Sequence, residues 1–260
     1  MLKLLKQHRM LEPEAAGNVL GCVVHGLKVC HNHNILVRAL APENLFIDST
    51  GIVKLANFEF GKKIMPGKFT MTVCGSKEYM SPEQMYGHGQ TLASDFWGLG
   101  CLMYELMCGT TPFADPSEDI HQVHSNVLQG ITDRILHDLG ENAGHLGEDL
   151  CKGLLNSKAE DRTGNKDWHD LEHHHWFVEY NVNMGDLNTG HYGANTKVFW
   201  KPTIDNNKVG AYYYNDDDHP LSLHDEIHHN GATQYGGHLN EGEETSGNST
   251  DLPWHWVFGE

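Results

Sequence analysis

The stretch from Ala93 to Gly109 constrains the fold more than any other part of the chain. It reads ASDFWGLGCLMYELMCG, so apolar side chains would cover almost the whole circumference of a helix. A helix with that pattern has to be buried, because other elements must shield each of its faces from water. Gly109 suits the left-handed position that commonly ends a helix. The sequence therefore predicts a central helix inside a lobe built from several others.

Helical patterns on both sides of this stretch predict the surrounding layer. Residues 1–12 read as the end of one helix, and Pro13 opens a second that ends near His31. Three later helices are expected at about Ser117–Gln129, Leu146–Asn156 and Lys166–Phe177. The predicted fold class is therefore mainly α.

One small β-element is expected in the segment from Asn34 to Gly61. The apolar runs Leu45–Ile47 and Ile52–Leu55 are separated by residues 48–51, which read DSTG. Asp, Ser and Gly favour tight turns, so the two runs predict a β-hairpin. The apolar run Ile35–Val37 predicts a short strand before the hairpin, with a loop between them, and a second loop follows the hairpin.

The charge of the chain limits its partners. The sequence holds 18 Lys and Arg against 35 Asp and Glu, which gives a formal net charge of -17. A nucleic acid would be repelled by this balance, so we expect no nucleic-acid partner. Basic protein surfaces are a more suitable class of partner, although acidity can also serve solubility alone.

Cysteine usage and hydropathy bear on the compartment. Six cysteines are present without a Cys-x-x-Cys pair, and four of them lie in apolar, helix-like surroundings. Small buried thiols account for this pattern, which indicates an intracellular, reducing compartment such as the cytoplasm. Because no run of about 18 apolar residues occurs, we expect no membrane span.

Several motifs in a fixed order resemble those of the protein kinase family. Val37–Asn44 reads VRALAPEN, where the catalytic loop of the family reads His-or-Tyr, Arg, Asp, Leu, Lys, Pro, Glu, Asn. Asn57–Glu59 stands at the metal-binding Asp-Phe-Gly, and Ser81–Glu83 at the Ala-Pro-Glu that closes the activation segment. The stretches NFEFGKKI, TVCGSKEYMSPE, LMYELMCGTTPF and HHHWF are most similar to the AGC group and, within it, to cGMP-dependent kinases.

The resemblance implies two regions. Residues 1–177 are expected to form a kinase-like large lobe, mainly α with the small β-hairpin. No Gly-rich loop and no Val-Ala-x-Lys strand precede the match, so we expect the small lobe to be missing. Residues 178–260 are rich in Gly, Asn, Asp and His, which predicts a long, irregular, acidic tail.

The resemblance also implies that catalysis is lost. Ala39 and Ala41 stand where the family has the catalytic Asp and Lys, and neither offers an acceptor or a charge. Asn57 replaces the metal-loop Asp, and Glu59 adds bulk and negative charge where a glycine approaches phosphate. Only Asn44 remains of the usual magnesium ligands. We therefore expect a pseudokinase with no catalytic residues and no cofactor.

Residues that support the large lobe in the family are retained. They are Pro42, Glu83, Asp95, Trp97 and Arg162. By the resemblance, Arg162 forms an ion pair with Glu83 and so holds the activation segment to the lobe.

The roles of three further residues stay open. In the family, the residue matching Arg38 meets a phosphate on the activation segment, and Thr72 occupies the phosphate-bearing position. Alternatively, Arg38 only donates to backbone carbonyls. Glu43 matches a residue that binds basic substrate peptides, so here it either binds a basic partner or is a solvated acid.

The 20 histidines raise the question of a metal site. His169 and residues 173–175 cluster, but cations near the end of a helix are stabilised by its dipole. His219, His228 and His229 lie in the tail without a Cys or carboxylate pattern. We therefore expect no metal site.

The sequence thus predicts a non-catalytic structural or scaffold subunit of a larger protein assembly. The aromatic terminus is expected to anchor in a pocket of a neighbouring subunit through Trp254, Trp256 and Phe258. One alternative is a regulatory pseudokinase that binds nucleotide weakly with a small lobe supplied by another chain. Others are a truncated serine/threonine kinase, against which Ala39 and Ala41 weigh, and a metal-binding protein based on the tail.

Overall fold

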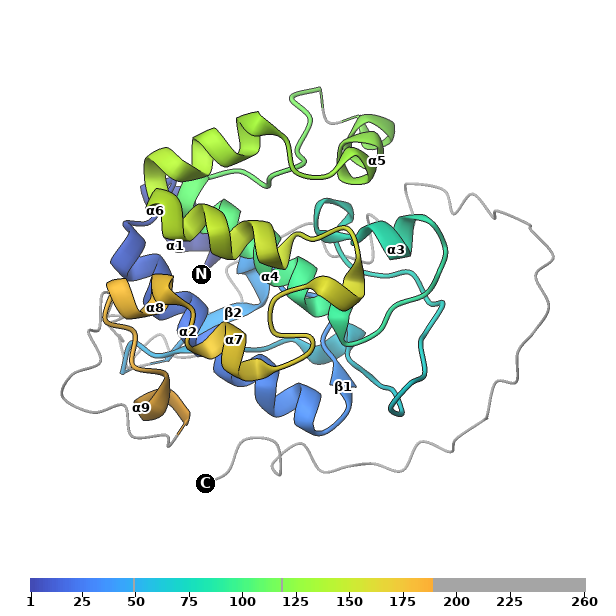
Figure 1. The fold of residues 1–260 in the computed structure, drawn as a ribbon, viewed down its shortest axis with the longest axis horizontal. Helices are drawn as coiled ribbons and strands as arrows, with labels where there is room; N and C mark the ends of the chain where they lie inside the picture. The colour runs from blue at the N-terminus through green and yellow to red at the C-terminus, as the bar shows by residue number, and fades with distance from the viewer. Residues whose placement is uncertain (49, 118, 189–260) are drawn as a thin grey trace, which may run out of the picture. The chain divides into compact units, whose positions relative to one another are not determined.

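The structure is a computed structural model that describes residues 1–48, 50–117 and 119–188 (Figure 1). These residues are mainly helical, which confirms the predicted fold class. The helices are α1 Leu2–His8, α2 Pro13–Asn32, α3 Pro82–Met85, α4 Ala93–Cys108, α5 Ile120–Gln129, α6 Asp133–Leu154, α7 Trp168–Glu172, α8 His175–Glu179 and α9 Met184–Asn188.

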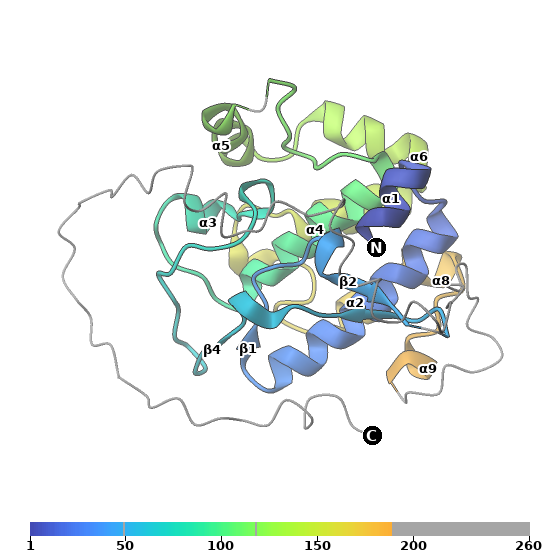
Figure 2. The same ribbon diagram turned by 180° about the vertical axis from the view of Figure 1, so that it is seen from behind.

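Helix α4 forms the centre of the lobe, as its apolar pattern predicts. All of its residues are buried except Glu105 and Cys108. It packs against α2 and α6, which lie beside it in both views (Figures 1 and 2). Gly109 ends the helix with φ 77°, a conformation that glycine adopts without strain.

Two small antiparallel sheets lie against this helical core. Strands β2 (Leu45–Ile47) and β3 (Val53–Leu55) form the predicted hairpin, in which Leu45 pairs with Leu55. Strand β1 (Ile35–Leu36) matches the predicted short strand, and its pairing with β4 (Lys62–Lys63) was not predicted from the sequence. The pairing of β1 with β4 places the start of the loop 37–44 beside the end of the loop 57–61.

Two helix boundaries differ from the predicted ones for identifiable reasons. Helix α6 begins at Asp133, well before the expected Leu146, because its first part continues through a break at Gly144 (φ 66°, ψ 179°). The single helix expected at Lys166–Phe177 is split into α7 and α8. The split lies at His174, whose backbone is extended (φ -59°, ψ 135°) rather than helical. In this conformation its ring accepts a hydrogen bond from the backbone N–H of Trp176 and so begins α8.

The core continues beyond residue 177. Val182, Met184 and Leu187 are buried and pack on the α2 helix. Glycine makes this close approach possible, because a Cβ at Gly21 would lie 2.7 Å from Cγ1 of Val182.

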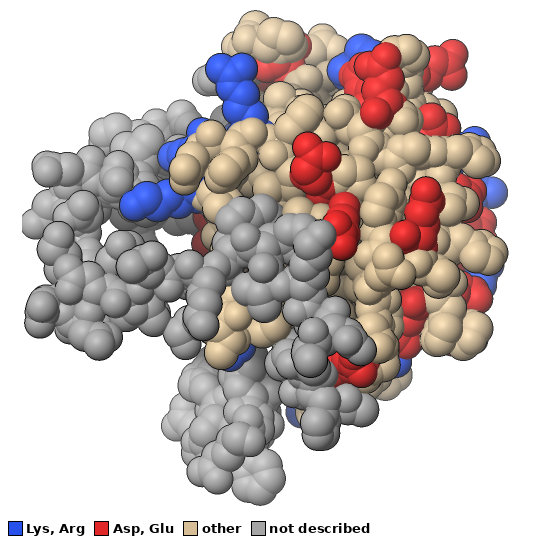
Figure 3. Space-filling model, turned by 90° about the vertical axis from the view of Figure 1, so that its left-hand side faces the viewer, with Lys and Arg blue, Asp and Glu red and all other residues tan. Residues whose placement is uncertain are grey.

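The described surface agrees with the acidic composition. Asp and Glu side chains are spread over the face seen in Figure 3. All six cysteines are free thiols, and burial raises the pKa of Cys22 to about 11 and that of Cys30 to about 12. Among the described residues, no helix combines the length and apolarity that crossing a membrane requires.

Candidate functional site

The loop 37–44 is held in place by one buried carboxylate from α4. Asp95 is 2% exposed, and its two oxygens accept from the Val37 and Arg38 N–H groups at 2.8 Å each. A third contact joins Asp95 Oδ2 to His31 Nε2 at 2.8 Å. These bonds stabilise Arg38 at φ 65°, a left-handed conformation that is unfavourable for a residue with a side chain. Asp95 therefore fixes the backbone at the start of the loop 37–44.

Asn44 and Asn57 are hydrogen bonded to each other at the centre of the site. Asn57 Nδ2 donates to Asn44 Oδ1 at 2.9 Å, and Asn44 Nδ2 donates to the Ala39 carbonyl at 3.0 Å. Asn57 sits at the start of the turn Phe58–Phe60 with φ 54°. We call these two side chains the amide pair. The hydrogen bond between them uses the amide nitrogen of Asn57 and the amide oxygen of Asn44.

Ala39 and Ala41 line the same loop with methyl groups. Ala39 is 9% exposed and Ala41 is 3% exposed, so both belong to the packed interior rather than to a reactive surface. Glu59, in contrast, is exposed on the turn after Asn57. No acid or base is therefore present at the two positions that carry the chemistry in kinases.

These residues do not fit the nucleotide-bound Mg²⁺ that the family resemblance implies. Mg²⁺ needs an octahedral set of hard oxygen ligands, which proteins supply mainly through carboxylates. Asn57 is a neutral amide, and the side-chain oxygen of Asn44 already accepts from it. Glu59 lies two positions further along and is exposed. The positions that bind the metal in the family thus hold no carboxylate here, and the side-chain oxygen of Asn44 is already used in a hydrogen bond.

Arg38 organises the activation segment through backbone carbonyls. Its Nε donates to the Phe60 carbonyl at 2.5 Å, and its NH1 lies 3.3 Å from the Thr72 carbonyl. Lys62 Nζ donates to the Thr70 hydroxyl at 2.8 Å. Thr72 is exposed. The contacts of Arg38 thus match the alternative stated above, in which it bonds carbonyls, and the phosphate-binding role of Arg38 stays a prediction.

The expected ion pair between Arg162 and Glu83 is present, with Arg162 buried and Glu83 partly buried. The NH1 and NH2 atoms of Arg162 reach the two oxygens of Glu83 at 2.8 and 2.7 Å. Arg162 is 2% exposed, and its guanidinium lies 5.2 Å from the ring centroid of Trp97. Burial alone would raise the pKa of Glu83, but the hydrogen bonds and charge of Arg162 outweigh it and lower that pKa. The pair ties α3 to the loop that precedes α7.

A group of three carboxylates was not identified from the sequence. Glu43, Glu78 and Glu105 come from three segments, and we call them the acidic cluster. Burial, followed by the charges of Glu43 and Glu78, raises the pKa of Glu105 to about 7. The Tyr79 hydroxyl donates to Glu105, and the Thr111 hydroxyl donates to Glu78 at 3.1 Å. Only Glu43 was singled out above, since nothing in the sequence placed the other two beside it.

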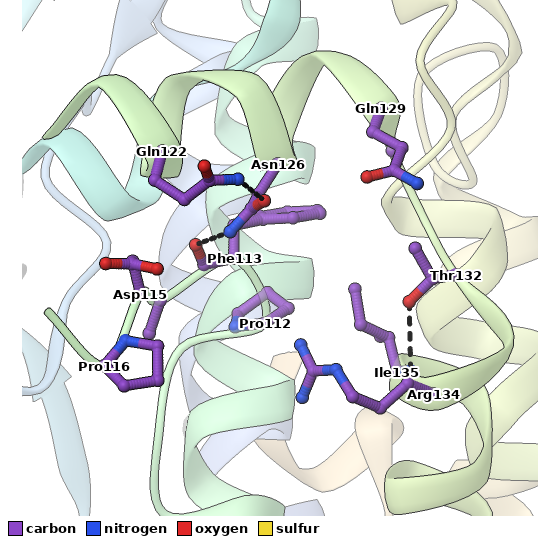
Figure 4. A pocket seen from close by; sticks show the side chains of 12 residues that line it. Pro112, Phe113, Asp115, Pro116, Gln122, Asn126, Gln129, Thr132, Arg134 and Ile135 are labelled. Carbon is purple, nitrogen blue, oxygen red and sulfur yellow. Dashed lines mark hydrogen bonds between the residues drawn. The ribbon is translucent and has the colours of Figure 1, made fainter. Parts of the chain in front are cut away.

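A hollow of about 450 Å³ lies elsewhere in the lobe, between α5 and the start of α6 (Figure 4). Several of its polar side chains form hydrogen bonds or an ion pair with other groups of the protein. Gln122 donates to Asn126 at 2.9 Å, Asn126 donates to the Phe113 carbonyl at 3.2 Å, and Arg134 pairs with Asp138 at 3.3 Å. The hollow therefore offers few unoccupied polar groups to a ligand.

Histidine clustering does not produce a metal site in the part of the chain that the structure describes. No group of three or more His, Cys, Asp or Glu side chains has a suitable arrangement there. The rings of His169 and His173 stack with centroids 4.0 Å apart. His219, His228, His229 and the aromatic residues Trp254, Trp256 and Phe258 lie outside the described residues.

Comparison with known proteins agrees with the geometry. The protein kinase domain family matches residues 1–177. The chain is 35% identical to "cGMP-dependent protein kinase, isozyme 1" of Drosophila melanogaster over 179 residues, which is 68% of this chain and 23% of that protein. It is 35% identical to "cGMP-dependent protein kinase 2" of Homo sapiens over 164 residues, 62% of this chain and 21% of that protein. For "cGMP-dependent protein kinase egl-4" of Caenorhabditis elegans the identity is 34% over 163 residues, 62% of this chain and 20% of that protein. The chain thus spans less than a quarter of the length of these relatives.

Proposed function

Because this chain belongs to the protein kinase family, we propose that it is a catalytically inactive member whose large lobe serves as a binding subunit of a larger protein assembly. The amide pair carries this proposal. Two neutral amide side chains are hydrogen bonded to each other at the position where phosphate transfer needs a carboxylate that binds Mg²⁺. Ala39 and Ala41 add the loss of the proton acceptor and of the phosphate-binding charge.

Several losses at one site favour inactivity more strongly than any single one. Phosphoryl transfer depends on positioning and on charge stabilisation, and its parts act together. Restoring one residue would leave the other two positions without their chemistry. The supporting frame, in contrast, is kept at Asp95 and at the Glu83–Arg162 pair. The residues that support the lobe are thus retained although the catalytic residues are lost, and this supports a role in binding other proteins through the surface of the lobe.

The acidic cluster supports a specific class of partner. We propose that Glu43, Glu78 and Glu105 bind a basic segment of another protein. Burial and mutual repulsion raise the pKa of Glu105 to about 7, so part of its population is protonated at neutral pH. A Lys or Arg side chain at this position would favour the ionised form and offset the repulsion. Such a partner also agrees with the net charge of -17.

Binding of a labelled basic peptide tests this role. The probe is a fluorescein-labelled peptide in which four arginines flank a serine, measured by fluorescence anisotropy with the full chain. We expect saturable binding that weakens about tenfold in the double variant Glu43→Gln, Glu105→Gln. Glu160→Gln removes an exposed acid elsewhere and should leave the affinity unchanged. Equal binding by the double variant and the parent chain would contradict the proposal.

A nucleotide-binding regulatory role is the competing proposal. A ligand that binds only the folded state raises the Tm of the protein. If this chain binds nucleotide, ATP with Mg²⁺ should therefore raise its Tm. Because the amide pair leaves no carboxylate at the metal positions, we expect no shift in Tm on adding ATP with Mg²⁺. A reproducible, saturable rise in Tm would favour the regulatory role instead.

The compartment is also a proposal. Six free thiols support an intracellular, reducing environment, most simply the cytoplasm. Fractionation of cells that express the tagged chain would test it. Recovery from a secreted or oxidising fraction, with disulfides formed, would contradict it.

A further inference from the structure

The extended segment Phe69–Val73 exposes apolar side chains that usually face a core. Phe69, Met71 and Val73 alternate along it and are 59%, 52% and 60% exposed, whereas Thr70 is 4% exposed. The backbone of Thr70 pairs with that of Gln90 through N–H···O bonds of 3.0 and 2.8 Å, which fixes this orientation. Successive side chains in an extended segment point to opposite sides. At Thr70 the polar side chain is therefore turned inward, and the apolar side chains of Phe69 and Met71 on either side of it face outward.

Phe69 and Met71 lie together over one glycine, and further exposed apolar residues are close to them in the sequence. A Cβ at Gly89 would lie 2.5 Å from the ring of Phe69 and 3.1 Å from the sulfur of Met71, so both side chains lie directly over that glycine. Met65 precedes the segment and is 64% exposed, and Tyr86 is 58% exposed. We call Phe69, Met71 and Val73 the apolar strip. Single exposed apolar residues are common, but a group of this kind normally marks an interaction surface.

The charge around the strip is opposite to that of the whole chain. Residues 61–77 contain four lysines and no Asp or Glu, although the chain carries a formal net charge of -17. Lys62 bonds to Thr70, whereas Lys63, Lys68 and Lys77 are exposed and form no ion pair with the described residues. The segment lies in an open loop between β4 and α3, at the edge of the lobe in both views (Figures 1 and 2). Exposed lysines of this kind steer and retain acidic partners.

We propose that the apolar strip and its lysines bind an acidic segment of a partner protein, in which apolar side chains alternate with Asp or Glu. The apolar side chains of the partner cover the strip, and its carboxylates meet Lys63, Lys68 and Lys77. A second copy of this chain is a poor occupant, because two chains of net charge -17 repel each other. This surface differs in sign and in residues from the acidic cluster, so its test is independent of the one given for that cluster.

Fluorescence anisotropy with the full chain tests the proposal. The probe is a fluorescein-labelled synthetic peptide, Glu-Phe-Asp-Leu-Glu-Phe-Asp. We expect saturable binding that weakens about tenfold in the double variant Phe69→Ser, Met71→Ser, because the buried apolar area is lost. The double variant Lys63→Glu, Lys68→Glu should weaken binding by a similar factor and reduce its dependence on salt. Circular dichroism and thermal unfolding establish that each variant is folded.

Matched controls remove exposed residues of the same kind elsewhere. Val178 is 62% exposed, so Val178→Ser tests the loss of an exposed apolar side chain, and Lys152→Glu tests the loss of an exposed charge. Both should leave the affinity unchanged. Equal binding by the Phe69→Ser, Met71→Ser variant would overturn the proposal, as would equal binding of a peptide with Ser in place of Phe and Leu.

Two further outcomes would assign the strip to another occupant and overturn the proposal. If neutralising Asp216, Asp217 and Asp218 to Asn in the full chain raises peptide affinity about tenfold, the acidic tail of this chain competes for the strip. If sedimentation detects a dimer that Phe69→Ser dissociates, the occupant is a second copy. Unchanged affinity in the first case and a monomer in the second would support a separate protein partner.

Discussion

The hydrogen bond between Asn57 and Asn44 depends on a donor at position 57. In Asn57→Asp a carboxylate oxygen would face the Asn44 oxygen, whose own amide nitrogen is held by the Ala39 carbonyl. We expect the variant to lose about 1 kcal/mol of stability without metal, and to recover it when Mg²⁺ is added. Thermal unfolding with and without Mg²⁺ measures this. Asn57→Ala is the control, since it loses the same bond and should show no recovery; equal responses of both variants would count against the closed amide pair.

The raised pKa of Glu105 makes a prediction about pH. The folded state retains a proton that the unfolded state releases between the ordinary pKa of 4.5 and the raised value of about 7. Stability therefore falls as pH rises through this window, and the full loss is present above it. Glu105→Gln removes the effect while it keeps an acceptor for Tyr79. We expect the variant to be more stable by about 2 kcal/mol at pH 8 and nearly equal at pH 4.5, as denaturant unfolding would show. A difference independent of pH would contradict this origin.

For single residues, the sequence shows which family residues have been replaced, but it does not show which side chains contact each other in the fold. Ala39, Ala41 and Asn57 were identifiable because a known motif fixes their positions. The amide pair and the acidic cluster were not, because the fold alone brings together residues from separate loops and from α4. Glu105 in particular read as one position of an apolar helix, and burial beside two other acids gives it its unusual pKa.

The Glu83–Arg162 pair links separate elements, so its loss should affect the whole lobe. Arg162→Ala leaves the carboxylate of Glu83 without its guanidinium and removes donors to the Ala93 and Asn156 carbonyls. We expect a loss of about 3–5 kcal/mol in the free energy of unfolding, measured by denaturant titration. Lys166→Ala breaks the fully exposed pair with Asp161 and should change stability little. Similar effects of the two variants would show that the Glu83–Arg162 pair has no special role.

The break at Gly144 within α6 also permits a test. Its φ of 66° and ψ of 179° belong to a region that only glycine adopts readily, and no atom lies near the position of an added Cβ. Helix propensity alone predicts that Gly144→Ala stabilises by about 1 kcal/mol. We expect instead a loss of about 1–3 kcal/mol in thermal or denaturant unfolding. Stabilisation would mean that α6 is continuous.

The same glycine explains why α6 was only half predicted. Its first part has a clear apolar face, at Ile135, Leu139 and Ala143, but the helix as a whole contains four glycines, and several polar residues also interrupt the pattern. Helix α4, which is apolar on almost every side, and the hairpin were predictable because the local sequence pattern agrees with the burial of these residues. The β1–β4 pairing was not, because two-residue strands carry almost no periodic signal.

For the whole molecule, two surfaces of opposite charge on one lobe distinguish this chain from a simple acidic protein. The acidic cluster suits a basic segment, and the apolar strip with its lysines suits an acidic one. Both proposed interactions should weaken with rising salt, because the charges involved are at least partly exposed. The lobe could then hold two different protein segments at once, as a scaffold requires.

The most direct test of the central claim measures binding and phosphate transfer with one peptide. The full chain is incubated with radiolabelled ATP, Mg²⁺ and the arginine-flanked serine peptide, alongside an active kinase as a positive control. The account predicts saturable binding of the peptide, with transfer no greater than in a reaction without protein. Transfer to the serine that falls in step with binding in the variant Glu43→Gln, Glu105→Gln would contradict it.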